Sequence, residues 1–196
     1  MKEIRQRTLG LSCPKPSVVR WSVWLLLWAA VMVPSLASPP KLTATEFRTV
    51  YLAKVPILAT WATNSLPGTN TNLIIGVLGP DPFGGLLEKL TANQTVGGRP
   101  IVIKMDADAE TAARCNILFI PADQQAAWLG LRRSMGESGI SGVLTIGEDS
   151  EFLKTGGIIR LLPEKRSCEL SLSNAGAQAD WLRLDPKLKR AAQIVP

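Results

Sequence analysis

Short, largely apolar runs recur through the chain, separated by turn-forming residues and by segments with helical spacing. The runs are rich in β-branched residues, which is typical of strands buried on both faces of a parallel sheet. Gly79-Pro80 ends the first run and Pro121 ends the third. The sequence therefore predicts strands at residues 73–78, 101–105, 116–120, 142–146 and 158–162.

The segments between these runs predict helices. Apolar side chains in residues 42–63 recur at spacings of three and four, and Pro56 is expected to kink or split this helix. Asp81-Pro82 and Asp185-Pro186 each place a capping residue before a proline, which favours a helix start. The remaining predictions are a helix or loop at residues 106–114, a helix at 122–137, one helical turn at 149–154 and a last helix at 186–194.

The C-terminal third changes pattern. Residues 168–172 alternate apolar and polar side chains after a turn at 163–166, as an antiparallel strand covered on one face does. Residues 182–184 are compatible with a further short strand. The expected fold class is α/β: a single mixed β-sheet of five to seven strands with helices on both faces, forming one domain over residues 38–196.

The N-terminal segment has the three parts of a signal peptide. A basic leader precedes an uncharged, mostly apolar run at residues 21–33, Pro34 breaks that run, and Ser35-Leu36-Ala37 supplies small residues for a signal peptidase. We expect cleavage after Ala37 and export to the periplasm, so residues 1–37 would leave the mature protein. An uncleaved membrane anchor is the alternative, but the run is shorter than the roughly 20 apolar residues that a spanning helix needs.

Charge and residue counts exclude several functions. Most of the formal net charge of +6 belongs to the leader, so the domain has no electrostatic footprint for nucleic acid. The chain contains no histidine, which removes Ser-His-Asp triads, Cys-His dyads and His-based metal sites. Cys115 and Cys168 are the cysteines outside the leader. They either form a disulfide in an oxidising compartment or remain two separate buried thiols.

Several segments resemble chemical sites and are better explained structurally. The glycine-rich turn at residues 76–85 lacks the residues of a phosphate-binding loop, and its prolines remove N–H donors, so a tight turn into a capped helix is favoured. Asp106, Asp108 and Glu110 could face a cation, but a solvated acidic connection is favoured. Glu148, Asp149 and Glu151 could supply paired catalytic carboxylates, but a role in capping a helix start is favoured.

Other residues carry weaker expectations. Trp61, Trp128 and Trp181 lie in apolar patterns and are expected in the core. A hydrolase using a Ser134–Lys154 pair is a distant hypothesis, because sequence cannot bring these residues together. No catalytic residue, metal ligand or cofactor is predicted.

Five segments follow one another in a characteristic order: residues 75–84, 97–102, 115–120, 143–146 through Phe152 to 156–159, and 182–195. This order of motifs resembles the YfiR-like (YfiR/HmsC) family of periplasmic proteins. Two features depart from the family pattern. Members often have His after the cysteine of the third segment, where this chain has Asn116, and the first helix is less aromatic here than is usual in the family.

The resemblance implies a regulator without catalytic residues. Its best-understood members bind the periplasmic sensor part of a membrane diguanylate cyclase and hold the cyclase off. Dimerisation and disulfide state are implicated in control, so a homodimer is a further expected arrangement, although this chain can form at most one disulfide within the domain. The alternative function is a periplasmic small-ligand-binding α/β protein that uses the turn at residues 79–84.

Overall fold

The computed structural model describes residues 43–62, 72–136, 140–163 and 168–195, all of which belong to one unit spanning residues 41–196. The expected leader at residues 1–37 lies outside the described residues, as does most of the expected turn at 163–166. No helix among the described residues is both long and apolar enough to cross a membrane.

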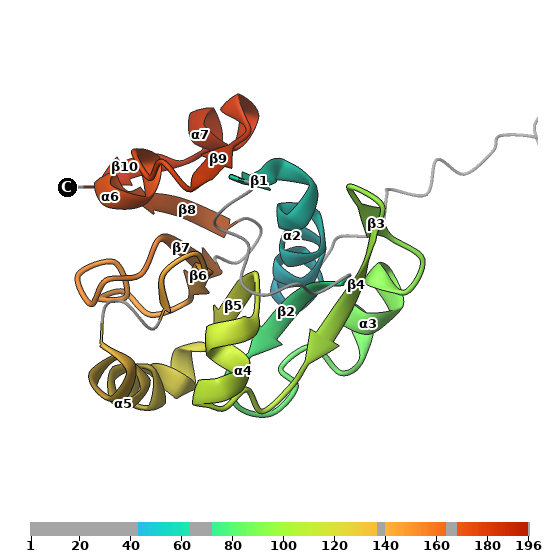
Figure 1. Cartoon of the computed structure of the whole chain (residues 1–196), viewed down its shortest axis with the longest axis horizontal. Helices are drawn as coiled ribbons and strands as arrows, with labels where there is room; N and C mark the ends of the chain where they lie inside the picture. The colour runs from blue at the N-terminus through green and yellow to red at the C-terminus, as the bar shows by residue number, and fades with distance from the viewer. Residues whose placement is uncertain (1–42, 63–71, 137–139, 164–167, 196) are drawn as a thin grey trace, which may run out of the picture. The chain divides into compact units, whose positions relative to one another are not determined.

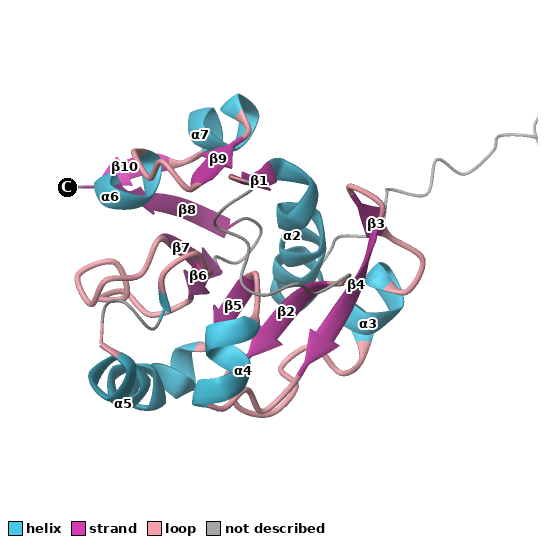
Figure 2. Ribbon diagram, in the orientation of Figure 1, coloured by secondary structure: helices cyan, strands magenta, loops and turns pink. Residues whose placement is uncertain are grey.

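Eight strands form the main sheet, in the order β10-β8-β7-β6-β5-β2-β4-β3 (Figures 1 and 2). Its centre is parallel, and β8 (Cys168–Ser173) runs antiparallel to β7 (Ile159–Pro163). These pairings confirm the predicted mixed α/β sheet. The other central strands are β2 (Leu73–Val77), β4 (Arg99–Lys104), β5 (Ile117–Ile120) and β6 (Leu144–Gly147).

Two short edge strands raise the strand number above the predicted five to seven. β3 (Thr95–Val96) pairs antiparallel with β4, and β10 (Gln193–Val195) pairs parallel with β8. The last helix, α7 (Pro186–Ala191), starts at its predicted position but ends early, because the chain then extends along β8. Strands of two or three residues are too short to show a hydrophobic period, so the sequence did not reveal them.

Helix α2 (Ala44–Leu58) begins with a reciprocal cap, in which the Thr43 hydroxyl accepts from the Glu46 N–H and the Glu46 carboxylate accepts from the Thr43 N–H. Pro56 lies inside the helix without ending it at that residue. The predicted helical continuation is wrong beyond Leu58. β1 (Ala59–Trp61) is extended and pairs antiparallel with β9 (Leu182–Leu184), outside the main sheet.

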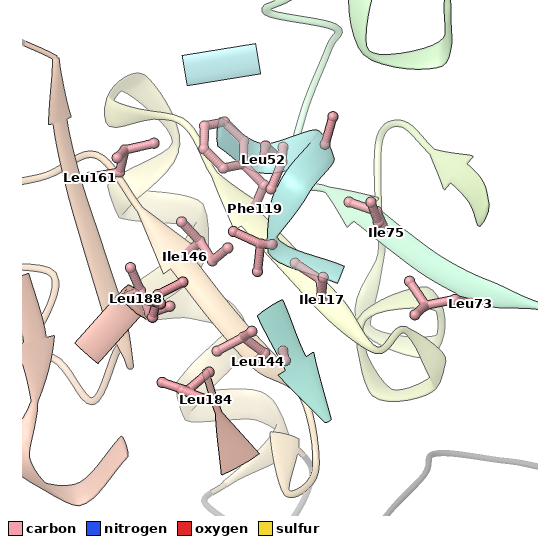
Figure 3. Close-up of a cluster of buried hydrophobic side chains, with 14 of the residues drawn as sticks. Leu52, Leu73, Ile75, Ile117, Phe119, Leu144, Ile146, Leu161, Leu184 and Leu188 are labelled. Carbon is pink, nitrogen blue, oxygen red and sulfur yellow. The ribbon is translucent and has the colours of Figure 1, made fainter. Parts of the chain in front are cut away.

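Helices cover both faces of the sheet, as predicted. On β5, Ile117 and Phe119 point into one core, whereas Leu118 and Ile120 point into the other. The first core receives side chains of α2, α3 (Leu86–Thr91) and α7 (Figure 3). The second receives α4 (Ala109–Arg114) and α5 (Gln125–Met135), which follows the short 3₁₀ turn η1 (Ala122–Gln124).

The buried face of α2 differs from the predicted stripe. The helical spacing predicts Phe47, Val50 and Val55 on the buried face, and of these Val55 is fully buried whereas Phe47 and Val50 are only partly buried. Leu52, which was not part of the predicted stripe, is fully buried. The buried face of α2 is therefore rotated relative to the predicted one and includes Thr49. The Thr49 hydroxyl donates to the Thr45 carbonyl at 2.6 Å. This rotation places Arg48 beside the sheet edge.

Candidate functional site

The order of the parallel strands reverses at β2, which has β4 on one side and β5 on the other. Open α/β sheets commonly bind ligands outside the carboxyl ends of strands at such a reversal. Here that edge is formed by the segments that follow β2, β5 and β6. The polar groups of these three segments are therefore the first candidates for a functional site.

The turn after β2 uses its own donors. Asp81 accepts hydrogen bonds from the Phe83 N–H at 2.7 Å and from the Gly85 N–H at 2.6 Å. Gly79 has a φ of 80°, and the Gln124 side chain packs so closely against it that a Cβ would lie 2.8 Å from Gln124 Cδ. The turn is therefore closed by internal contacts and gives the ligand-binding alternative no support.

The helix predicted to start at Asp81-Pro82 begins later. Helix α3 starts at Leu86, after Gly84 and Gly85, which both have positive φ values. Asp81 therefore caps the preceding turn instead of the helix, because its two carboxylate oxygens reach the N–H groups within that turn. The predicted tight turn is confirmed, and the predicted helix start is wrong.

An ion pair between α2 and the end of β6 dominates this edge. Arg48 Nη1 lies 3.0 Å from both carboxylate oxygens of Glu148, and Arg48 Nη2 donates to the Pro82 carbonyl at 2.9 Å. The guanidinium also lies 5.5 Å from the centroid of the Phe83 ring. One side chain thus connects helix α2, the β2–α3 turn and strand β6.

Burial dominates the electrostatics of this pair. The Glu148 side chain is 3% exposed and the Arg48 side chain is 18% exposed. Burial raises the pKa of the Glu148 carboxyl above its ordinary value, Arg48 opposes that rise by charge and hydrogen bonding, and Asp123 adds to it. The prediction that Glu148 serves as a helix cap is therefore wrong. Asp149 does cap the turn, since it accepts from the Glu151 N–H at 2.8 Å.

The acidic segment before and within α4 does not converge on a cation. Asp106 is exposed with a φ of 50°, and Asp108 caps α4 by accepting from the Thr111 N–H at 2.8 Å. Glu110 forms an exposed pair with Arg114 at 3.0 Å. Among the described residues, no group of three or more His, Cys, Asp or Glu side chains is placed to hold a metal ion.

The structure places Cys115 and Cys168, whose pairing the sequence left open, beside strands that are not neighbours in the sheet. Cys115 is a free, buried cysteine, and burial raises the pKa of its thiol to about 12. Cys168 opens β8 at the end of β7, and β8 lies three strands from β5 in the sheet. Three spacings of about 4.8 Å separate the strands by about 14 Å, which exceeds the Cα separation of about 7 Å that a disulfide can bridge.

Two of the three tryptophans that were expected in the core are buried there. Trp61 and Trp128 are buried as predicted, and their indole N–H groups donate to the Gly142 carbonyl and the Thr155 hydroxyl, both at 3.1 Å. Trp181 is only partly buried at the margin of the first core.

The Ser134–Lys154 hypothesis finds no support. The Ser134 hydroxyl donates to the Leu131 carbonyl at 2.9 Å within α5. Lys154 instead pairs with Glu151 at 2.8 Å. Each side chain thus has a local partner of its own.

A cleft lies beside the pair of strands β1 and β9. Its volume is about 550 Å³, and its walls come from the end of α2, residues 177–180 and residues 182–189. Ile57 lies at its margin with 61% of its surface exposed, and Lys189 Nζ donates to the Ala177 carbonyl at 3.0 Å. This cleft was not predicted from the sequence, because Thr60 of the unpredicted strand β1 also lines it and β1 pairs with β9 beside it.

The structure is thus an α/β domain. At its sheet edge, Glu148 is bound by Arg48, and Asp81 is bound by N–H groups of its own turn. A family model described as YfiR/HmsC-like matches residues 45–193, from the first turn of α2 to the start of β10. The chain therefore belongs to the YfiR/HmsC-like family, which confirms the resemblance drawn from its motifs. No curated protein matches the chain.

Asn116, one of the positions that depart from the family pattern, contributes to the hydrogen bonding of the sheet. Asn116, at the position where members often have His, is buried, and its side-chain oxygen accepts from the Ile74 N–H at 2.8 Å. Its own backbone N–H donates to the Ile74 carbonyl at 2.9 Å, and its carbonyl accepts from Leu144 at 2.9 Å. Asn116 thus links the starts of β2, β5 and β6.

Proposed function

We propose that this chain is a periplasmic regulatory protein that acts by binding the periplasmic part of a membrane sensor protein, such as a diguanylate cyclase. The observation that carries the proposal is the family match, which spans nearly all of the α/β domain. Regulators of this kind need a specific contact surface and no catalytic group. In this account, residues 1–37 direct export and are cleaved after Ala37.

Exposed apolar side chains offer places where such a partner would bind. Among the described residues, the large apolar side chains with high exposure are Ile57 at 61%, Ile194 at 55% and Leu129 at 38%. Ile57 and Ile194 belong to the part of the domain that includes β1 and β10, whereas Leu129 lies on α5. These positions allow the partner surface to be located by single substitutions that do not disturb the core.

Envelope crosslinking in the native host tests the proposal. We expect the tagged full-length chain to be captured with a membrane sensor protein, identified by mass spectrometry. We also expect either Ile57→Lys or Leu129→Lys to reduce the capture at least about tenfold, since a charge buried at an interface is costly. The other variant serves as the matched control, and unchanged thermal unfolding shows that both are folded.

Two results would count against the proposal. Capture of the chain alone, or only of crosslinked copies of itself, would leave it without a sensor partner. A partner captured equally by a leader variant such as Leu26→Lys, which places a charge in the apolar run and should block export, would place the contact in another compartment.

A further inference from the structure

The buried ion pair at the sheet edge is asymmetric in its access to solvent. Glu148 is almost completely enclosed, whereas Arg48 reaches the surface with part of its guanidinium. Rotation of the Arg48 side chain would hydrate it without any movement of the sheet. The Glu148 backbone is bonded to the Ile120 carbonyl at 3.1 Å, and its enclosed carboxylate also accepts from the Ala122 backbone N–H.

The charged groups around Glu148 leave Arg48 as its counter-charge. Helix α2 supplies Arg48, and η1 supplies Asp123, whose charge opposes ionisation of Glu148. The β2–α3 turn supplies Asp81, which is held by N–H groups of that turn, and the next residue along the chain is Asp149, which caps the following turn. Removing Arg48 would therefore leave the buried carboxylate with the Ala122 backbone N–H as a donor and with the opposing charge of Asp123.

We propose that the Arg48–Glu148 pair is a proton-operated latch: when Glu148 is neutralised, Arg48 turns into solvent and the first turns of α2 loosen while the sheet stays folded. The contact geometry supports this directly. Both Glu148 oxygens are bound by the same nitrogen of Arg48, so loss of the carboxylate charge weakens both contacts together. The guanidinium then keeps its hydrogen bond to the Pro82 carbonyl at 2.9 Å, at a partly exposed position, and its contact with the Phe83 ring at 5.5 Å.

Proton binding favours the released form because Arg48, when it is in contact, lowers the pKa of Glu148. With Arg48 in contact, its charge and hydrogen bonds lower the pKa of the Glu148 carboxyl. With Arg48 turned away and Glu148 still buried, that lowering is lost, so the released form binds the proton more tightly. By linkage, acidification shifts the equilibrium toward release.

The stability of the whole fold has the opposite pH dependence. The folded pKa of Glu148 is raised above the ordinary value that holds in the unfolded chain. Its contribution to stability is therefore fully present below the ordinary pKa and is lost as the pH rises through the folded pKa. Acidification would thus loosen α2 while protonation of Glu148 stabilises the fold as a whole. This difference distinguishes the latch from acid denaturation.

Hydrogen exchange of the purified chain, followed by mass spectrometry at about pH 5 and about pH 8 with correction for the intrinsic exchange rate, tests the latch. We expect amide protection in residues 44–52 to fall about tenfold at the lower pH, while protection of β5 and β6 is retained. Glu148→Gln mimics the neutral state and should show the lower protection at both pH values. Arg114→Met, which breaks an exposed pair, should keep the pH response.

Equal protection of residues 44–52 at both pH values in the unsubstituted chain would overturn the latch. A parallel loss of protection in β5 and β6 would also overturn it, because that result indicates acid denaturation. Should Glu148→Gln fail to fold, Arg48→Gln gives the second test. It removes the charge that pairs with Glu148, so residues 44–52 should show the lower protection at both pH values, and a pH response as large as in the unsubstituted chain would contradict the latch.

Discussion

Replacing Arg48 with Met is expected to lower the free energy of unfolding by about 3–5 kcal/mol at neutral pH, because removing one partner of a buried ion pair leaves the other charge uncompensated. Glu148 would remain enclosed, with Asp123 nearby and without the charge of Arg48. The Pro82 carbonyl would also lose its donor. Denaturant unfolding followed by circular dichroism measures this loss.

The pH dependence of this loss is a stricter test than its size. Without Arg48, the pKa of the buried Glu148 rises further, since two influences that lowered it are gone. The penalty should therefore shrink at about pH 5, where the carboxyl takes up a proton instead of remaining charged. Arg114→Met is the matched control: its pair with Glu110 is exposed, and we expect a change below about 0.5 kcal/mol. A loss for Arg48→Met no larger than that of the control would contradict the account.

Phe119→Ala is expected to destabilise the domain by about 3–5 kcal/mol through the cavity it leaves in the first core. Phe119 is completely buried on β5, and its ring centroid lies 5.2 Å from that of Phe83. The Phe83 ring in turn supports the Arg48 guanidinium at 5.5 Å. The cavity therefore removes packing beneath the latch as well as apolar contacts in the core.

Two substitutions serve as controls for the cavity. Phe119→Leu keeps most of the buried volume, and its cost should be about 1–1.5 kcal/mol. Leu129→Ala removes a large apolar side chain at an exposed position of α5, so its cost should stay near 0.5 kcal/mol or below. Thermal and denaturant unfolding measure all three variants, and equal losses for Phe119→Ala and Leu129→Ala would show that the first core does not depend on Phe119.

The central strands could be predicted from the sequence because each is a short apolar run with turn residues at its ends. β5 is buried at all four positions, which is the environment that its uncharged run predicts. β1 could not be predicted in the same way. Residues 59–61 continue the helical spacing of α2, and their extended conformation depends on pairing with β9, more than 120 residues later in the chain.

The sheet-edge site was only partly accessible to sequence reasoning. Asp149 and Glu148 are adjacent and acidic, and local rules assign both to a helix start. What distinguishes them is the contact of Glu148 with Arg48, which lies 100 positions earlier in the sequence. One signal did exist: Arg48 lies three and four positions before Tyr51 and Leu52, at helical spacing from side chains that pack in the core.

The measurement that tests the central claim most directly is the intracellular level of cyclic di-GMP in the native host with and without this gene. If the chain holds off a membrane diguanylate cyclase, deletion should raise that level severalfold. The full chain should restore it, whereas the export-blocked Leu26→Lys chain should not. An unchanged cyclic di-GMP level after deletion, under conditions in which the protein is expressed, would contradict the proposed regulation of a diguanylate cyclase.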